Sequence, residues 1–223
     1  MLHRKMFFVD GYNLYHAIDA LSDTDIQFKD CKWLDLQALC KNYVNSSFEE
    51  FTGIKYFTAL SWKPQSQIRQ RIYINALTYQ CQNKIDIIYG KFKKRTRYCN
   101  LCKQKFTAHE EKLTDVNIAI SLFENALKNT FDEAVIISAD SDLIPSILAI
   151  KRIFPGKLIS ILPPHKSIAV ELVNCTHKHY KMKASALLKS LLPNPVSNFY
   201  APDNWQSKNY KFDEISKTYV HSF

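Results

Sequence analysis

The chain has 223 residues, of which 30 are Lys or Arg, 21 are Asp or Glu and only 4 are Gly, so its formal net charge is +9. The 46% hydrophobic content supports a folded core and excludes disorder across the whole chain. The glycines cannot be arranged as G-x-x-x-x-G-K or G-x-G-x-x-G, which excludes the two common glycine-rich phosphate loops. The positive charge favours a polyanionic partner, with nucleic acid ahead of an anionic membrane surface.

Apolar periodicity predicts strands and helices that alternate along the chain. A buried strand over 5–10 precedes helices over 13–21 and 33–44. Further strands are expected over 54–60, 85–89, 134–138, 157–162 and 178–182, with helices over 64–82, 113–128, 143–154, 167–174 and up to 192 between and after them. Such alternation indicates an α/β fold, a three-layer α/β/α sandwich around a central parallel sheet. From about residue 193, prolines and polar residues predict an extension that is packed as an arm or partly disordered.

The longest apolar runs are only a few residues, whereas a membrane-spanning helix needs about 20. We therefore expect no membrane partner and a cytoplasmic location, where thiols stay reduced.

Aspartates stand where predicted strands end or helices begin. Asp10 ends the first strand, Asp115 opens a helix, and Asp140 and Asp142 follow a later strand. In parallel sheets these places lie at one edge, so the four carboxylates are expected to converge. Converging carboxylates repel unless a cation neutralises them, and oxygen ligands suit Mg²⁺ or Mn²⁺. Each aspartate taken alone is also a normal helix cap, and for Asp115 and Asp142 capping is an equally good interpretation.

Three blocks of the sequence resemble the signature of the NYN domain family, a branch of the PIN-like superfamily of metal-dependent ribonucleases. The blocks are VDGYNL (9–14), EKLTDV (111–116) and SADSDL (138–143), and the resemblance covers roughly residues 4–185. It implies a PIN-like sandwich over residues 1–192 with the extension over 193–223. Ala139 stands where the family often has Gly.

By this resemblance, Asp10, Asp115, Asp140 and Asp142 are the metal ligands, and Asn13 lines the same catalytic site. Flanking positions that could orient ligands or phosphate are Thr114, Asn117 and Ser138, and Glu110 and Glu111 could also reach the site.

A basic insert, residues 91–109, lies between the strand at 85–89 and the helix that carries Asp115. Its Lys and Arg side chains can pair with phosphates, and interleaved aromatic residues can stack on unpaired bases. The expected substrate-binding residues are Lys91, Lys93, Lys94, Arg95 and Arg97. The alternative interpretation is a solvated run of charge.

Cys99 and Cys102 within the insert have the spacing of half a zinc site. His109 or Cys81 could supply a third ligand to Zn²⁺. Unliganded thiols and a redox pair are the alternatives. The remaining cysteines, Cys31, Cys40 and Cys175, fit ordinary core or surface positions.

Together these features predict a Mg²⁺- or Mn²⁺-dependent endoribonuclease whose partner is single-stranded or structured RNA. A non-catalytic nucleic-acid-binding or adaptor module is the alternative, and a metal-dependent phosphatase is a third. A homo-oligomer, or a protein partner bound through the extension, is also expected.

Overall fold

The computed structural model describes residues 2–167, 169–207, 210–213 and 218–221. Six parallel strands form the central sheet, in the order β3-β2-β1-β6-β7-β8. Their bounds are β1 His3–Asp10, β2 Glu49–Thr58, β3 Ile85–Tyr89, β6 Glu133–Ile137, β7 Leu158–Ile161 and β8 Lys178–His179. The order runs outward in both directions from the β1–β6 pair. The carboxyl ends of β1 and β6 therefore form the switch point where open α/β sheets bind ligands.

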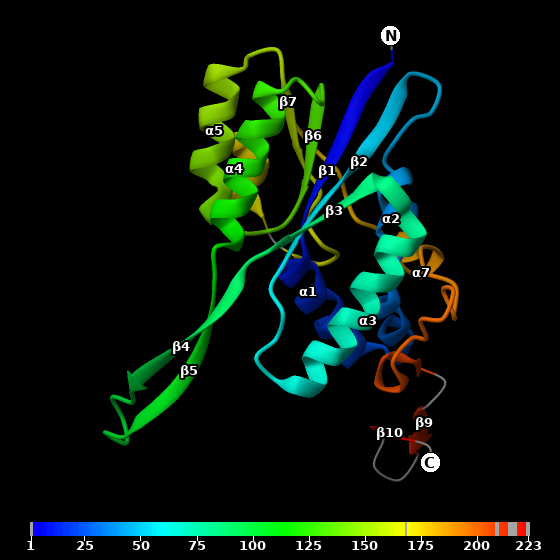
Figure 1. The fold of residues 1–223 in the computed structure, drawn as a ribbon, viewed down its shortest axis with the longest axis vertical. Coiled ribbons are helices and arrows are strands. Elements are labelled where there is room, and N and C mark those ends of the chain that lie inside the picture. The colour runs from blue at the N-terminus through cyan, green and yellow to red at the C-terminus, as the bar shows by residue number, and fades with distance from the viewer. Residues whose placement is uncertain (1, 168, 208–209, 214–217, 222–223) are drawn as a thin grey trace.

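Helices cover both faces of the sheet (Figure 1). One face carries α1 Gly11–Thr24, α2 Leu36–Lys41, α3 Pro64–Cys81 and α7 Ala184–Lys189. The other carries α4 Thr114–Leu127, α5 Ile144–Ile153 and α6 Val170–Cys175. In β1, Phe7 and Val9 join the first core, while Met6 and Phe8 join the second. This alternation across the strand produces two cores, one on each side of the sheet, and the three-layer sandwich is confirmed.

The helix predicted over 33–44 is wrong in its first part. A 3₁₀ helix, η1 Ile26–Trp33, precedes α2, which begins only after Asp35. The Asp35 carboxylate accepts a hydrogen bond from the Ala38 amide at 2.9 Å. This capping bond fixes the start of the helix, which apolar spacing alone does not locate. Further 3₁₀ turns in the described part of the chain include η2 Gln82–Lys84, η3 Ser141–Leu143 and η4 Asp203–Trp205.

The basic insert folds as an antiparallel hairpin of β4 Lys91–Tyr98 and β5 Lys105–Lys112. It forms a two-stranded sheet of its own and projects from the body of the molecule (Figure 1). Most side chains of the hairpin are polar and exposed, so its strands show no apolar alternation in the sequence.

The start of the C-terminal extension packs against the helices on the α1 face. The Trp33 indole donates to the Pro193 carbonyl at 2.9 Å, and the Trp205 side chain is buried. The Ser207 amide donates to Asp30 at 2.7 Å. Two short strands, β9 Tyr210–Asp213 and β10 Thr218–His221, pair antiparallel further along. The boundary at residue 193 stays a prediction, and part of the extension lies outside the described residues.

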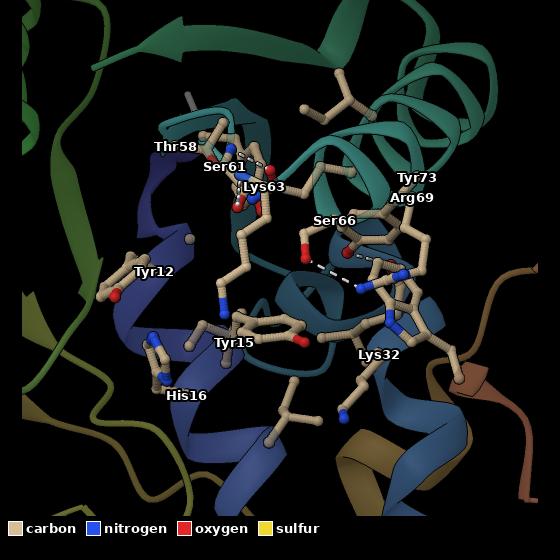
Figure 2. Close-up of a pocket in the computed structure, with 18 of the residues that line it drawn as sticks. Tyr12, Tyr15, His16, Lys32, Thr58, Ser61, Lys63, Ser66, Arg69 and Tyr73 are labelled. Atoms are coloured by element: carbon tan, nitrogen blue, oxygen red, sulfur yellow. Dashed lines mark hydrogen bonds between the residues drawn. The ribbon is translucent and has the colours of Figure 1, made fainter. Parts of the chain in front are cut away.

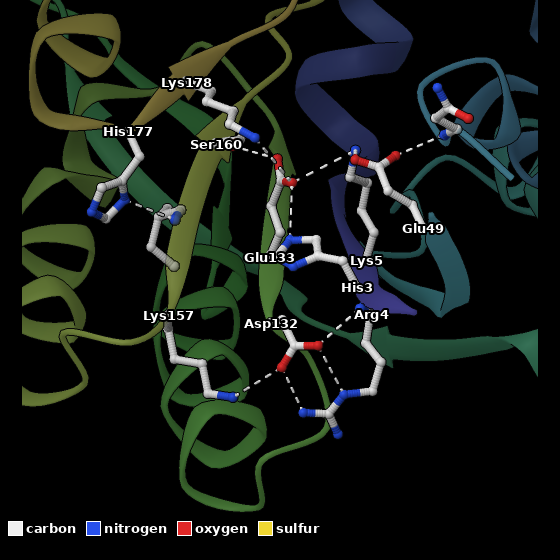
Figure 3. A network of polar contacts seen from close by, with 12 residues as sticks. His3, Arg4, Lys5, Glu49, Asp132, Glu133, Lys157, Ser160, His177 and Lys178 are labelled. Atoms are coloured by element: carbon white, nitrogen blue, oxygen red, sulfur yellow. Dashed lines mark hydrogen bonds and ion pairs between the residues drawn. The ribbon is translucent and has the colours of Figure 1, made fainter. Parts of the chain in front are cut away.

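A network of charges lies at the amino edge of the sheet (Figure 3). The Lys5 ammonium group, on a side chain only 1% exposed, contacts Glu49 at 2.8 Å and Glu133 at 3.6 Å. Glu133 also accepts from the Ser160 hydroxyl at 2.6 Å and the Tyr180 hydroxyl at 2.9 Å. The buried charges at this edge are therefore matched by partners of opposite sign.

Among the helices that the structure describes, none combines the length and the apolar character needed to cross a membrane.

Candidate active site

Asp10 occupies the junction between β1 and α1. Its side chain is buried, and one carboxylate oxygen accepts from the Asn13 amide at 3.0 Å, which caps α1. The other oxygen accepts from the Ser138 hydroxyl, also at 3.0 Å. Gly11 is required next, because a Cβ there would lie 2.6 Å from the Tyr56 ring. The Asp-Gly pair thus lets α1 begin directly against β2.

The end of β6 is joined to this junction by side chains. The Asn13 side-chain oxygen accepts from the Ala139 amide at 3.1 Å. The Asp140 amide donates to the Ser138 hydroxyl at 3.1 Å. These bonds hold the loops after β1 and β6 together, and they bring residues about 130 positions apart to one place.

The third segment of the site is the start of α4. Leu113, just before the helix, has a left-handed backbone with φ of 81°, which is strained for a branched side chain. Thr114 is buried and donates a hydrogen bond to Glu111. Gly90, after β3, allows this approach, since a Cβ there would lie 2.6 Å from the Thr114 hydroxyl. The base of the hairpin is therefore packed against the residues that orient Asp115.

These three segments enclose a polar pocket of about 120 Å³, which we call the acidic pocket. It is lined by Asp10, Tyr12, Asn13, Glu111, Lys112, Leu113, Thr114, Asp115 and Asp140. Desolvation, followed by the charges of Asp115 and Asp140, raises the pKa of Asp10. Desolvation, Asp140 and Asp142 raise the pKa of Asp115, and desolvation, Asp10 and Asp115 raise that of Glu111. Like charges therefore act on one another across the pocket.

Some predicted site residues lie outside the wall of this pocket. Asp142 is exposed, and its amide donates to the Asp140 carboxylate at 2.9 Å. Ser138 lies behind Asp10, and Asn117 donates to the Tyr89 carbonyl at 3.3 Å. Conversely, Tyr12 and Lys112 line the pocket although neither was predicted as a site residue. Tyr12 lies inside the VDGYNL block, so its position in the motif was an available signal.

The donor set of the acidic pocket suits a hard cation, because its carboxylate and amide donors are oxygen atoms. Within the described residues, however, no three His, Cys, Asp or Glu side chains stand close enough to hold a metal ion as they are placed. The site thus offers the right ligands for Mg²⁺ or Mn²⁺ without a finished coordination shell.

The hairpin presents its basic residues on both of its faces. Successive side chains alternate, so Lys91, Lys93, Arg95 and Arg97 share one face, while Lys94 lies on the other with Phe92, His109 and Glu111. Arg97 is paired with Glu110, with a nitrogen–oxygen distance of 2.9 Å. That pairing, followed by a contact from Lys112, lowers the pKa of Glu110. Glu110 does not line the acidic pocket, and only Glu111 of the two glutamates reaches it.

The hairpin does not bring the expected zinc ligands together. His109 pairs with Lys94, four residues along the strand from Tyr98. At about 3.3 Å per residue this is far from Cys99 for zinc–ligand bonds of about 2.0–2.3 Å. Cys81 is buried in the core at the end of α3, and burial raises its pKa to about 12. Hydrogen bonding from Cys102 lowers the pKa of Cys99, so these two thiols interact with each other.

Figure 2 shows a second and larger cavity, whose volume is about 360 Å³. We call it the aromatic pocket. It lies on the α1 face of the sheet, and Tyr12 lines both pockets. Its ring-bearing lining residues are Tyr12, Tyr15, His16, Tyr56, Trp62, Tyr73, Phe92, His109 and Trp205. Its charged lining residues are Lys32, Lys63 and Arg69, with no Asp or Glu.

Comparisons with known proteins show which sequences and structures this chain resembles. The family model described as "NYN domain" matches residues 4–183. A curated relative, 6-hydroxy-3-succinoylpyridine 3-monooxygenase HspA of Pseudomonas putida (strain DSM 28022 / S16), is 24% identical over 253 residues, covering 95% of this chain and 78% of that protein. A crystal structure of a protein of unknown function, VPA0982 from Vibrio parahaemolyticus RIMD 2210633, superposes with a TM-score of 0.54 at 13% identity. It covers 82% of this chain and 94% of that one, and it supports the fold alone. With its parallel sandwich and its three signature segments meeting at one edge, this chain belongs to the NYN domain family of PIN-like proteins.

Proposed function

We propose that this protein is a metal-dependent ribonuclease that hydrolyses phosphodiester bonds within RNA. NYN domains are in general nucleases, and nuclease activity implies contact with nucleic acid. The observation that carries the proposal is the placement of Asp10, Asp115 and Asp140 on one pocket at the switch point of the sheet. A strongly basic chain that gathers carboxylates in one pocket at this point fits phosphate chemistry with a cation between protein and substrate.

In this proposal Asp10, Asp115 and Asp140 hold Mg²⁺ or Mn²⁺, and Asp142 acts from outside through Asp140 or a water. The cation would polarise a phosphoryl oxygen and lower the pKa of a bound water. Asn13 already uses its side-chain oxygen on Ala139. The side-chain nitrogen of Asn13, Nδ2, would therefore donate to a phosphate oxygen.

The residues that flank the aspartates are proposed to position them. Ser138 donates to Asp10, and Thr114 donates to Glu111. Asn117 ties α4 to the end of β3 through the Tyr89 carbonyl. Each of these bonds fixes a segment of the acidic pocket, which keeps the carboxylates in place before substrate arrives.

The basic residues of the hairpin are proposed to hold the RNA backbone. Lys91, Lys93, Lys94 and Arg95 are exposed, and no carboxylate pairs with them within the described residues. Ammonium and guanidinium groups that have no carboxylate partner bind phosphates and release the counterions condensed on the nucleic acid. Arg97 is the exception, because Glu110 competes for it.

The decisive test is Asp10→Asn, measured by single-turnover cleavage of single-stranded RNA with Mn²⁺. We expect a loss of about a hundredfold or more, since a charge at the reacting centre is removed. Asparagine is also a good helix cap, so the fold should survive. Asp35→Asn is the matched control, because Asp35 is likewise a buried cap but belongs to α2, away from the pocket. Equal cleavage by both variants would overturn the proposal.

Two alternatives have distinct signatures. A non-catalytic binding module would bind RNA with no cleavage that EDTA abolishes and Mn²⁺ restores. A phosphatase would hydrolyse a small phosphate ester without needing the hairpin. Reversing the charges of Lys93, Lys94 and Arg95 should reduce RNA cleavage and leave hydrolysis of a small ester unchanged. Equal loss of both activities would argue against the proposed role of the hairpin.

A second candidate function is action on a small heteroaromatic compound. The relative from Pseudomonas putida is named for action on a substituted pyridine. The observation that favours this candidate is the aromatic pocket, whose rings and cations suit a flat anionic molecule. Turnover of a pyridine carboxylate by the wild-type protein, with no cleavage of RNA, would favour this candidate over RNA hydrolysis.

A further inference from the structure

We infer that the aromatic pocket is a subsite for one unpaired base of the RNA, held next to the phosphate that occupies the acidic pocket. The inference rests on the proposed ribonuclease function and deepens it. It assigns a role to residues outside the three signature segments and makes the pocket a determinant of where the chain is cut.

The two pockets share a wall. Tyr12 lines both of them, and Gly11, next to Asp10, lines the aromatic pocket. The base of the hairpin is likewise divided, because Phe92 and His109 line the aromatic pocket and Glu111 lines the acidic pocket. A ligand that is continuous from one pocket to the other would therefore pass along Tyr12 and the base of the hairpin.

The aromatic surface is available to a ligand. Trp62 is 51% exposed and Tyr12 is 43% exposed, so both rings can be reached from solvent. The Trp62 and His109 rings stack on each other, with centroids 3.9 Å apart and an angle of 9° between their planes. This stack joins the loop before α3 to the hairpin. Flat, partly exposed rings are the surfaces on which proteins stack single-stranded bases.

The charge of the pocket matches an anion. Figure 2 shows Lys32, Lys63 and Arg69 around Tyr15. Arg69 donates to the Ser66 hydroxyl at 3.1 Å, and the Lys63 ammonium lies 5.4 Å from the centre of the Trp62 ring. Neither has a carboxylate partner within the described residues, whereas Lys32 is paired with Asp19. In this inference the stacked rings contact the base, and the two cations without carboxylate partners, Lys63 and Arg69, contact the phosphates that flank it.

The size and shape of the pocket select an unpaired base. A cavity of about 360 Å³ is at the small end of ligand sites and suits one base or nucleoside. A base inside a duplex presents only its edge, and its faces are covered by neighbouring bases. A base must therefore be unpaired and turned out of its stack to enter.

The test uses the Asp10→Asn protein as parent, so that RNA is bound and not cut. Fluorescence anisotropy measures its affinity for a labelled single-stranded RNA hexamer and for a series of hexamers that each lack one base. We expect Trp62→Ala to weaken binding of the intact hexamer by about tenfold. One of the abasic hexamers should bind the parent about tenfold more weakly than the intact hexamer does. The Trp62→Ala variant should bind that abasic hexamer no more weakly still, since removing the base and removing the Trp62 ring abolish the same interaction.

Two more variants complete the design. Arg69→Ala should weaken binding of the intact hexamer and of that abasic hexamer alike, because it removes a phosphate contact. Tyr79→Ala is the matched control, since Tyr79 is an exposed ring on α3 that does not line the pocket, and it should bind as the parent does. Additive losses from Trp62→Ala and every abasic position would overturn the inference. It would also be overturned if a pyridine carboxylate bound the parent, lost affinity on Trp62→Ala, and RNA binding stayed the same.

The outcomes of this experiment are separate from those for the proposed function. If wild-type protein cleaves RNA and the losses are additive, the ribonuclease stands and the base subsite fails. If no cleavage is found but the losses are not additive, the base subsite stands and the hydrolytic function fails.

Discussion

Charged side chains are arranged differently at the two ends of the strands in the central sheet, which we call the amino edge and the carboxyl edge. At the amino edge, Arg4 holds the pKa of Asp132 at about 2. At the carboxyl edge, burial and neighbouring carboxylates raise the pKa of Asp10. Both edges belong to the same two strands, since Arg4 and Asp10 lie in β1 and Asp132 immediately precedes β6. The amino edge pairs its charges and supports the fold, whereas the carboxyl edge keeps like charges together and is suited to binding a cation.

The buried amino-edge network offers the largest test of this difference. Lys5→Met removes the cation that faces Glu49 and Glu133 and leaves buried carboxylates without compensation. We expect a loss of about 3–5 kcal/mol in the free energy of unfolding, measured with urea. Lys178→Met is the control, because Lys178 is half exposed and 3.9 Å from Glu133, so it should cost less than about 1 kcal/mol. Equal effects of the two substitutions would show that the burial of Lys5 does not matter.

The carboxyl edge should respond to a cation, with an effect that depends on pH. At a Mn²⁺ concentration about 100 times its Kd, binding should stabilise the fold by about 2.7 kcal/mol. Because the pKa values of Asp10, Asp115 and Glu111 are raised, these carboxyls hold protons to a higher pH than usual. The cation must displace those protons, so the shift in melting temperature should be larger at pH 7.5 than at pH 5. If Mn²⁺ raised the melting temperature of an Asp10→Asn, Asp115→Asn double variant by the same amount, the cation would have to bind outside the acidic pocket.

The smallest expected change in stability comes from removing the charge of Asp115, which Asp140 and Asp142 repel. The folded-state pKa of Asp115 is raised, so the folded state binds more protons than the unfolded state between the two pKa values. Stability contributed by this group therefore falls as pH rises through that interval and stays lower above it. Asp115→Asn should stabilise the metal-free protein near neutral pH by a few tenths of a kcal/mol, because Asp115 is exposed and solvent screens it. Urea unfolding in EDTA measures this, and a destabilised variant would mean that Asp115 has a structural partner.

Much of the candidate site could be predicted from the sequence. The VDGYNL and SADSDL blocks stand at the ends of strands that are adjacent in the sheet, and Asp10 and Asp140 line the same pocket. Asp142 lies within the 3₁₀ turn η3, is exposed and does not line the pocket, and apolar periodicity does not locate so short a turn. Cys81 and His109 were poor candidates for zinc ligands for a different reason. Distance along the chain says little about separation in space when one residue lies in the core and the other in a projecting hairpin.

The sequence by itself determined the alternation of strands and helices, the family, and the acidic residues at strand ends. It could do so because buried strands and amphipathic helices leave their own periodicities, and because a motif keeps its spacing. Only the tertiary structure decided which loops meet, that Tyr12 separates two pockets, and that Trp62, Arg69 and Trp205 line one of them. Those residues come from different elements with no common pattern, and only the packing of α1, α3, the hairpin and the C-terminal extension brings them together.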